Sequence, residues 1–406
     1  MQCDLRDRPE ARSPIVRSVL INYAYDATIA DPDALLDRYT TLTGWSDALV
    51  AAGVASVTVV QRFWRDAELE RGGVRYAFRL DEGPPVADER TRPAALHEVV
   101  VAARPDVVHV NGLMFPAQLE SLRRSLPRSC ALIVQDHAGV APASRRWWDV
   151  RARARHASMR RGLRAADALF FTSADQARPW REAGVIAPQP RVYPIVESST
   201  TMRAVAREAA REASGVDGRP ASLWAGRLTA NKDPLTVLDG FERALAELPE
   251  ARLSMVYGED DLLPEVRSRV ERSAALRARV RLCGRVSHDR LAAYYSAADL
   301  FVLGSHHEGS GYALIEALAC GSVPVVTDIP SFRAIADDGR LGALWPPGDA
   351  WAFARALTRA ASGDVAAKRL EIAADFERRL SWPAVGRRAL ALYQEVAAAR
   401  IAGPHA

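Results

Sequence analysis

The feature that most constrains this chain is an alternation of short apolar runs with longer stretches of helical period, which occurs twice. In the first half the apolar runs are Val16–Tyr23, Ser56–Gln61, Val107–Val110, Ala131–Gln135, Ala168–Thr172 and Val192–Ile195. In the second half they are Ser222–Ala225, Arg252–Tyr257, Val280–Leu282, Leu300–Leu303 and Val323–Thr327. Apolar strands separated by helices are typical of parallel sheets covered on both faces. The sequence therefore predicts an α/β fold of two Rossmann-like, doubly wound domains that face a cleft.

A change in composition divides the two halves. The segment Glu197–Arg219 is rich in Ser, Thr, Ala and Arg, which is typical of a linker with one helix. The last helix is expected to begin near Ser381, with Pro383 in its first turn. The 406 residues suit two domains. We therefore expect an N-terminal domain over 1–200, a linker over 201–219, a C-terminal domain over 220–380 and a C-terminal helix within 381–406.

The charge of the chain gives little support to nucleic-acid binding. The formal net charge is +4, but lysine appears only at Lys232 and Lys368, so the excess of arginine indicates a compositional bias. No helix-turn-helix, zinc or RNA-binding signature accompanies it, and we expect no nucleic-acid partner. Residues Met1–Pro14 are polar and lack a signal-peptide pattern, and no run approaches 18 apolar residues. We expect a cytoplasmic protein and leave open peripheral contact at the inner membrane face.

The segment Ser305–Glu316 carries the first chemical signal. It joins the apolar run Leu300–Leu303 to a helix that we expect to end at Gly321. A loop between a strand and a helix N-terminus offers free backbone N–H groups and a positive dipole end to phosphate. Glu308 in the loop and Glu316 in the helix suit the hydroxyls of a sugar and a ribose. The alternative, that Glu308 caps the helix and Glu316 is solvated, fits poorly with the apolar neighbours of Glu316.

A second loop, Trp224–Pro234, has the same position between a strand and a helix. Arg227 and Lys232 are placed in it to converge on one anion. A compact ammonium differs physically from a guanidinium fork, so a lysine in a chain that otherwise uses arginine is informative. The alternative is two solvated surface cations.

On these motifs the C-terminal half resembles the retaining glycosyltransferases of family 4, which have the GT-B fold. The matching pieces are Gly226-Arg227-Leu228 with Lys232, the Glu308 and Glu316 pair separated by seven residues, and Val280–Val286. The resemblance implies that Arg227 and Lys232 hold the donor diphosphate, Glu308 approaches the donor sugar and Glu316 binds the ribose. It further implies donor contacts by these positions: Gly226, Gly284, Arg285, Val286, Gly309, Ser310, Gly311, Tyr312 and Ala313.

The N-terminal half resembles the family more weakly. Thr43-Gly44-Trp45 matches its glycine loop, which implies that Gly44 lets the backbone approach the donor phosphates. The family usually has two glycines there and a His-Asp order where this chain has Asp136-His137. We favour His137 for the cleft because it follows an apolar strand, the alternative being a loop histidine satisfied within the fold. His109 lies inside a strand and is expected to be structural.

The resemblance implies a nucleotide-sugar-dependent glycosyltransferase with catalytic residues Arg227, Lys232, Glu308 and His137. The expected partners are a nucleotide-sugar donor bound to the C-terminal domain and an unknown acceptor bound to the N-terminal domain. The final helix is expected to cross back to that domain. Retention of configuration is implied, with no cofactor and no metal, because Arg227 and Lys232 take the place of a metal ion. A GT-B epimerase and a catalytically silent nucleotide-sugar-binding subunit remain as alternatives.

The segment Arg145–Arg164 is ambiguous. It contains eight arginines and the pair Trp147-Trp148. Basic residues with interfacial aromatics dock on anionic lipid. The alternative is a solvated helix whose tryptophans pack inward.

Overall fold

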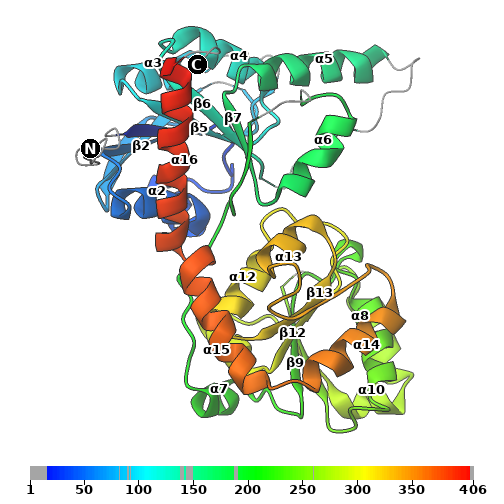
Figure 1. The fold of residues 1–406 in the computed structure, drawn as a ribbon. Coiled ribbons are helices and arrows are strands. Elements are labelled where there is room, and N and C mark those ends of the chain that lie inside the picture. The colour runs from blue at the N-terminus through cyan, green and yellow to red at the C-terminus, as the bar shows by residue number, and fades with distance from the viewer. Residues whose placement is uncertain are drawn as a thin grey trace, which may run out of the picture.

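The computed structural model describes residues 16–81, 83–88, 91, 93–137, 141–142, 150–186, 191–258 and 260–402. Within this range the chain forms two α/β domains, each built on one sheet (Figure 1). Three sequence interpretations fall wholly or partly outside it. They concern Met1–Pro14, the first residues of the basic segment, 145–149, and the end of the expected C-terminal helix region, 403–406.

The N-terminal sheet has the strand order β3-β4-β2-β1-β5-β6-β7-β8, with only β3 antiparallel to its neighbour among the described strands. Its strands are β1 (Arg17–Asn22), β2 (Ser56–Phe63), β3 (Ala67–Arg71), β4 (Val74–Leu80), β5 (Val107–Asn111), β6 (Ala131–Gln135), β7 (Ala168–Phe171) and β8 (Val192–Pro194). Side chains of β1 alternate between two cores, since Val19 and Ile21 belong to one cluster and Leu20 to the other. The prediction of a parallel sheet covered on both faces is confirmed.

The hairpin β3–β4 was not predicted from the sequence. Its turn is Gly72-Gly73, and both residues have positive φ, 62° and 77°, as a two-residue hairpin turn requires. The helices of this domain are α1 (Pro32–Arg38), α2 (Thr40–Ala51), α3 (Ala94–Ala102), α4 (Pro116–Ser125), α5 (Val150–Arg164), η1 (Ala174–Ala177) and α6 (Arg178–Glu182).

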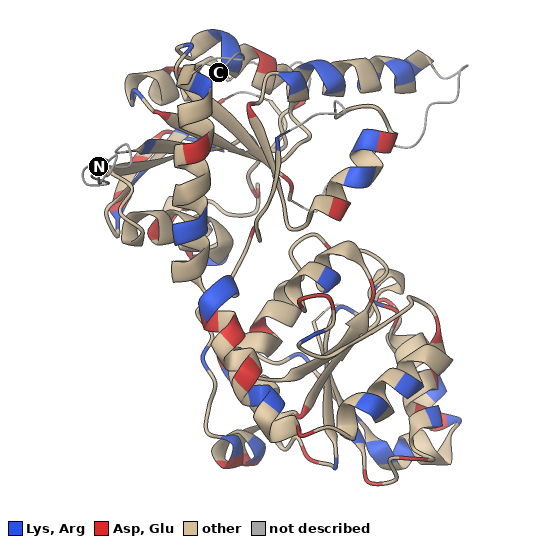
Figure 2. Cartoon of the chain, in the orientation of Figure 1, with Lys and Arg blue, Asp and Glu red and all other residues tan. Residues whose placement is uncertain are grey.

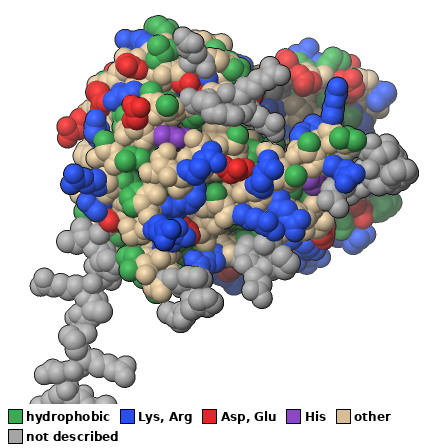
Figure 3. Space-filling view, turned by 90° about the horizontal axis from the view of Figure 1, so that it is seen from above, with side chains coloured by type: hydrophobic (Ala, Val, Ile, Leu, Met, Phe, Trp, Pro, Cys, Tyr) green, Lys and Arg blue, Asp and Glu red, His purple; other side chains and the backbone are tan. Residues whose placement is uncertain are grey.

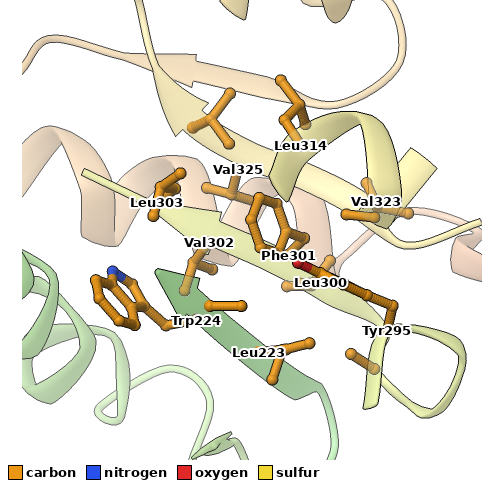
Figure 4. Close-up of a cluster of buried hydrophobic side chains, with 14 of the residues drawn as sticks. Leu223, Trp224, Tyr295, Leu300, Phe301, Val302, Leu303, Leu314, Val323 and Val325 are labelled. Atoms are coloured by element: carbon orange, nitrogen blue, oxygen red, sulfur yellow. The ribbon is translucent and has the colours of Figure 1, made fainter. Parts of the chain in front are cut away.

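The C-terminal sheet is parallel throughout its described strands, in the order β11-β10-β9-β12-β13-β14. The strands are β9 (Ala221–Gly226), β10 (Arg252–Tyr257), β11 (Val280–Gly284), β12 (Leu300–Leu303), β13 (Val323–Thr327) and the unpredicted β14 (Ala343–Trp345). Figure 4 shows Trp224 of β9, Phe301 of β12 and Val325 of β13 in the apolar cluster around the central strands.

Helices surround this second sheet. They are α7 (Arg207–Ser214), η2 (Ala230–Lys232), α8 (Pro234–Ala244), α9 (Leu263–Glu271), α10 (Ala274–Arg279), α11 (His288–Ala297), α12 (Tyr312–Ala319), α13 (Pro330–Ile335), α14 (Ala350–Ala361), α15 (Val365–Asp375) and η3 (Phe376–Leu380). The one helix expected in the linker region is α7. It packs against the C-terminal domain, since Ala210 is fully buried in the core of that domain.

The last helix, α16 (Trp382–Ala402), returns to the N-terminal domain, as the resemblance implied (Figure 1). Val385, Leu392 and Tyr393 of α16 are buried in one of the two N-terminal cores. The Tyr393 hydroxyl lies 2.6 Å from His109 Nδ1, and His109 is fully buried. Burial lowers the pKa of His109 to about 3, which fits the structural role expected for this residue.

The structure corrects the sequence interpretation of Gly44. No loop surrounds Gly44, because this residue lies within helix α2. A Cβ built at Gly44 would lie 2.4 Å from the Trp382 ring. Gly44 therefore lets the start of α16 pack closely on α2, and the expected glycine loop is wrong.

Candidate functional site

The two predicted phosphate loops lie side by side because β9 and β12 are neighbouring parallel strands. Backbone and side-chain hydrogen bonds join the loops. Asn231 Nδ2 donates to the His307 carbonyl at 2.9 Å, and His307 N–H donates to Asn231 Oδ1 at 3.1 Å. His306 Nε2 lies 3.1 Å from Asp233 Oδ2. The loops 227–233 and 305–311 therefore form one surface at the carboxyl edge of the sheet, where ligands bind in such folds.

Lys232 and Glu308 form an ion pair across these loops, with side chains only 12% and 13% exposed. Arg227 directly follows β9 and is exposed. Lys232 and Glu308 were predicted separately, one for the diphosphate and the other for the donor sugar. The structure brings them into direct contact, so an anion that binds Lys232 competes with Glu308.

Glu316 is buried within α12 and does not lie at the solvent surface. One carboxylate oxygen lies 2.8 Å from His288 Nε2, and the other accepts a hydrogen bond from the Tyr295 hydroxyl at 3.1 Å. The hydrogen bond to Glu316 raises the pKa of His288. The interpretation of Glu316 as a solvated helix residue is thereby excluded. His288 and Tyr295, which hold this carboxylate, were not singled out in the sequence.

The other predicted donor-site positions lie at strand ends and at the start of α12. Gly311 is the N-cap of α12 with φ 60°, and a Cβ there would lie 2.8 Å from Ile335 Cδ1, so a larger residue does not fit. Tyr312 and Ala313 are the first two residues of α12. Gly226 and Gly284 end β9 and β11.

Arg285 and Val286 follow β11. Arg285 Nη2 donates to the Gly258 carbonyl at 3.1 Å, which links the ends of β10 and β11. Val286 packs against the C-terminal core. Both residues thus lie at the same carboxyl edge as the two loops, and their expected contact with the nucleobase stays a prediction.

The N-terminal domain contacts the donor loop directly. Thr172 Oγ1 donates to the Gly309 carbonyl at 3.2 Å, and Gln176 Nε2 donates to the Glu308 carbonyl at 3.1 Å. A cavity of about 220 Å³ lies between the domains here, with Gln176 and Trp180 on one side and Glu308 on the other. Ser310 lies close enough to Glu197, which follows β8, to lower the pKa of its carboxyl. The domains therefore meet at the donor loop.

His137 lies beside a second and larger cavity, of about 380 Å³, in the N-terminal domain. His137 Nε2 lies 3.2 Å from Asn111 Oδ1, and His137 Nδ1 lies 3.1 Å from Glu197 Oε2. Burial raises the pKa of Glu197 to about 8, with Asp136 adding to the effect, whereas the His137 side chain is 38% exposed.

Glu197 was missed in the sequence, where it marks only the start of the linker. Its neighbours His137 and Ser310 are 60 and 113 positions away in the sequence. No local sequence pattern therefore indicates that Glu197 lies beside them. The signal that could have drawn attention to the cavity is the polar residue at the end of each apolar strand: Asn22, Asn111 and Gln135.

Within the described residues, no group of three or more His, Cys, Asp and Glu side chains is arranged to hold a metal ion. Of the helices described here, none is both long and apolar enough to cross a membrane.

Two Rossmann-like domains, with a phosphate-loop pair in the second and a helix that returns to the first, define a GT-B glycosyltransferase. Comparisons with known proteins support the same class of enzyme. Residues 219–362 match the family model described as glycosyl transferases group 1, and residues 40–195 match the glycosyl transferase 4-like domain. The chain belongs to the group 1 glycosyltransferases of family 4 type and is a nucleotide-sugar-dependent enzyme.

Similar curated proteins include the GDP-mannose:cellobiosyl-diphosphopolyprenol alpha-mannosyltransferase of Xanthomonas campestris. It is 29% identical over 280 residues, which cover 68% of this chain and 67% of that protein. The phosphatidyl-myo-inositol mannosyltransferase of Mycobacterium leprae is 30% identical over 178 residues, 43% of this chain and 46% of that protein.

Similar solved structures include the sucrose-phosphate synthase of Thermosynechococcus elongatus. It has a TM-score of 0.66 and 21% identity, and the match covers 94% of this chain and 99% of that one. HepE of Anabaena, in complex with UDP and glucose, has a TM-score of 0.61 and 13% identity, and the match covers 93% of this chain and all of that one. At these identities the likeness shows the fold.

Proposed function

We propose that this enzyme transfers a sugar from a nucleoside-diphosphate sugar, with retention, to a hydroxyl held in the N-terminal cavity. The observation that carries the proposal is the partly buried Lys232–Glu308 pair at the paired loops. A diphosphate that replaces Glu308 on Lys232 frees this carboxylate for the hydroxyls of the donor sugar. Arg227 on the same loop supplies a second cation for the leaving group. Glu316, fixed by Tyr295 and His288, is the candidate for the ribose hydroxyls.

GDP-mannose is the first donor to examine, because the Xanthomonas relative is named for it. The test is a thermal-shift series with GDP and UDP, followed by transfer assays with GDP-mannose and UDP-glucose. Binding to the folded state stabilises it by about 2.7 kcal/mol at a hundredfold excess over the dissociation constant. The shift should survive EDTA, since no metal is expected in the donor site. If neither nucleotide shifts the melting temperature at millimolar concentration, the donor site is refuted.

Retention and turnover need their own measurements. Proton NMR of the product reports whether the anomeric configuration of the donor is kept. A chain that binds nucleotide sugar but neither transfers nor hydrolyses it would be a binding subunit. Release of a 2-epimer in place of a glycoside would indicate an epimerase.

We also propose that helix α5 faces an anionic membrane surface during catalysis. Its buried side consists of His156, Met159, Gly162 and Leu163, while its six arginines are exposed: Arg151, Arg153, Arg155, Arg160, Arg161 and Arg164. The helix lies along one end of the N-terminal domain (Figure 2), and the view from above shows basic side chains gathered over this end (Figure 3). The names of both mannosyltransferase relatives mention a lipid, a polyprenol in one and phosphatidyl-myo-inositol in the other, which favours a lipid-linked acceptor.

The test of this second proposal is sedimentation with vesicles. Each arginine near an anionic surface contributes about 1 kcal/mol, and the attraction falls within a Debye length. We expect binding to phosphatidylglycerol vesicles that is lost in salt and in an Arg151→Gln, Arg153→Gln, Arg155→Gln variant. Equal binding to neutral vesicles, or none to either, would exclude electrostatic docking.

A further inference from the structure

Two side chains of the N-terminal domain hold the backbone of the donor loop, 305–311, which belongs to the C-terminal domain. Gln176 Nε2 donates to the carbonyl of Glu308 at 3.1 Å and to that of Gly309 at 3.3 Å. Thr172 Oγ1 donates to the Gly309 carbonyl at 3.2 Å, and Thr172 is only 7% exposed. Two successive carbonyls of the loop are therefore fixed from across the domain interface.

The side-chain amide of Gln176 is itself held in one orientation. Gln176 lies in the short helix η1, and its Oε1 accepts a hydrogen bond from the Ser173 N–H at 3.1 Å. The Gln176 N–H in turn donates to Ser173 Oγ at 3.3 Å, which completes a capping box. Because Oε1 is engaged by a backbone donor, Nε2 is the end of the amide that meets the loop carbonyls. Gln176 is thus preorganised within its own domain to contact the other one.

Holding a carbonyl also orients the N–H group that follows it. A trans peptide unit is planar, so its C=O and N–H bonds point in opposite directions. Within the described residues a cis peptide bond occurs only at Arg219-Pro220, so both peptide units held here are trans. The N–H groups of Gly309 and Ser310 therefore point away from Gln176, and in the described chain neither donates to a backbone carbonyl. Both residues are among the positions predicted to contact the donor.

Glu308 is the residue at which these contacts meet the predicted chemistry. Its carbonyl is held by Gln176, whereas its carboxylate pairs with Lys232 of its own domain. A donor diphosphate that binds Lys232 releases the carboxylate but leaves the Glu308 backbone held. The side chain then turns about a fixed main chain. Groups that are fixed beforehand in this way stabilise a transition state without reorganisation during the reaction.

We propose that Gln176 is a positioning residue for sugar transfer. With Thr172 it fixes the two peptide units after Glu308, so that their N–H groups face the donor sugar. The inference rests on the proposed transfer reaction and goes beyond it, since it assigns the alignment of the donor loop to the N-terminal domain.

The test replaces the hydrogen-bond donor of Gln176 without a change of size. Gln176→Glu keeps the capping box, because glutamate also serves at this position. When ionised, the introduced carboxylate repels the two loop carbonyls, and when protonated it donates to one of them. We expect turnover relative to the wild type to fall at least about tenfold between pH 5 and pH 9, the effect of about one lost hydrogen bond. A ratio that stays constant across this range overturns the proposal.

Turnover is measured as release of GDP from GDP-mannose or of UDP from UDP-glucose, so that no acceptor has to be supplied. Division by the wild-type rate at each pH removes the titration of the groups around the adjoining cavity: Asp136, Asp175, His306, His307 and Glu308. A wild type that binds no nucleotide refutes the proposed function. A wild type that turns over, beside a variant whose ratio is independent of pH, overturns only the role of Gln176.

A matched control separates positioning from folding. Gln118 Nε2 also donates to two carbonyls, those of Asp88 and Thr91, but these lie within the N-terminal domain. Gln118→Glu should therefore lower the melting temperature as the pH rises, while turnover of the folded enzyme follows the wild type. An equal pH-dependent loss of turnover in Gln118→Glu would assign the effect to general destabilisation and overturn the proposal.

A second variant tests the same role through the other donor, whether or not Gln176→Glu folds. Thr172→Val removes the hydroxyl with little change of shape, so turnover should fall about three- to tenfold. Affinity for GDP and UDP should stay within about twofold of the wild type, because Arg227, Lys232 and Glu316 all lie in the C-terminal domain. Wild-type turnover in Thr172→Val, or a nucleotide affinity that falls as much as turnover, overturns the positioning role.

Discussion

Lys232 and Glu308 neutralise each other in the structure, although each was assigned to a different part of the donor. A nucleoside diphosphate lacks the transferred sugar that Glu308 is expected to bind, so this carboxylate only competes with the phosphates for Lys232. Glu308→Gln should therefore bind GDP or UDP as tightly as the wild type or more tightly, while sugar transfer falls. The measurement is nucleotide titration beside initial rates with the nucleotide sugar.

The chain offers a matched control for this substitution. Its only other lysine, Lys368, also pairs with a glutamate, Glu371, on α15. Glu371→Gln should change neither nucleotide affinity nor turnover. Nucleotide affinity that drops tenfold in Glu308→Gln would show that Glu308 supports phosphate binding and does not oppose it.

Gly44→Ala should loosen the contact between the last helix and the N-terminal domain. The added methyl group would lie 2.4 Å from the Trp382 ring, and overpacking of this kind costs about 1–3 kcal/mol. Gly363→Ala is the control, since its nearest atom would be 3.8 Å away. Thermal unfolding should show a loss for Gly44→Ala alone and partial recovery in Gly44→Ala, Trp382→Ala. If Gly44→Ala melts as the wild type does, the contact is not tight in solution.

Gly44 also shows where sequence reasoning reaches its limit. The strands were predicted because both faces of each sheet are apolar, and that signal is local. The edge strand β3, Ala67–Arg71, was missed because it is mostly exposed and carries charged side chains. The Gly72-Gly73 pair that follows it is typical of a hairpin turn and could have indicated it. The two phosphate loops were found because each joins a strand to a helix. The Trp382 contact of Gly44 and the His137 contact of Glu197 span distant parts of the chain, and only the fold brings these residues together.

The Glu197–His137 pair predicts how stability depends on pH. Between pH 6.5 and pH 8 the folded Glu197 carboxyl keeps its proton, because its pKa is raised to about 8. The unfolded pair holds none above pH 6.5, so the folded state binds more protons between pH 6.5 and pH 8, and stability falls as the pH rises there. At 1.36 kcal/mol for each pKa unit, Glu197 alone contributes a loss of about 2 kcal/mol across this window.

Glu197→Gln removes the group responsible. In this variant the fall between pH 6.5 and pH 8 should disappear. Denaturant unfolding at closely spaced pH values measures this slope, and the same downward slope above pH 6.5 in both proteins would assign it to other groups.

Arg227 and Lys232 carry the central prediction about catalysis. Breaking the bond to the diphosphate moves negative charge onto the leaving group, so cations placed beforehand stabilise the transition state more than the ground state. At an effective dielectric of about 20, each close pair of charges is worth about 4 kcal/mol before desolvation. Loss of one preorganised partner typically costs about a hundred- to a thousandfold in turnover. Arg227→Ala and Lys232→Ala should each lose this much while circular dichroism shows an intact fold.

The pattern among variants tests whether the two cations act together. If they hold one diphosphate, the double variant loses less than the product of the single losses. Lys232→Arg should also be impaired, because a planar fork does not fill the place of a compact ammonium beside Glu308. Initial rates against donor concentration give the losses for each variant. A folded Arg227→Ala enzyme with near wild-type turnover would remove Arg227 from the reaction and leave Lys232 as the phosphate-binding cation to be tested alone.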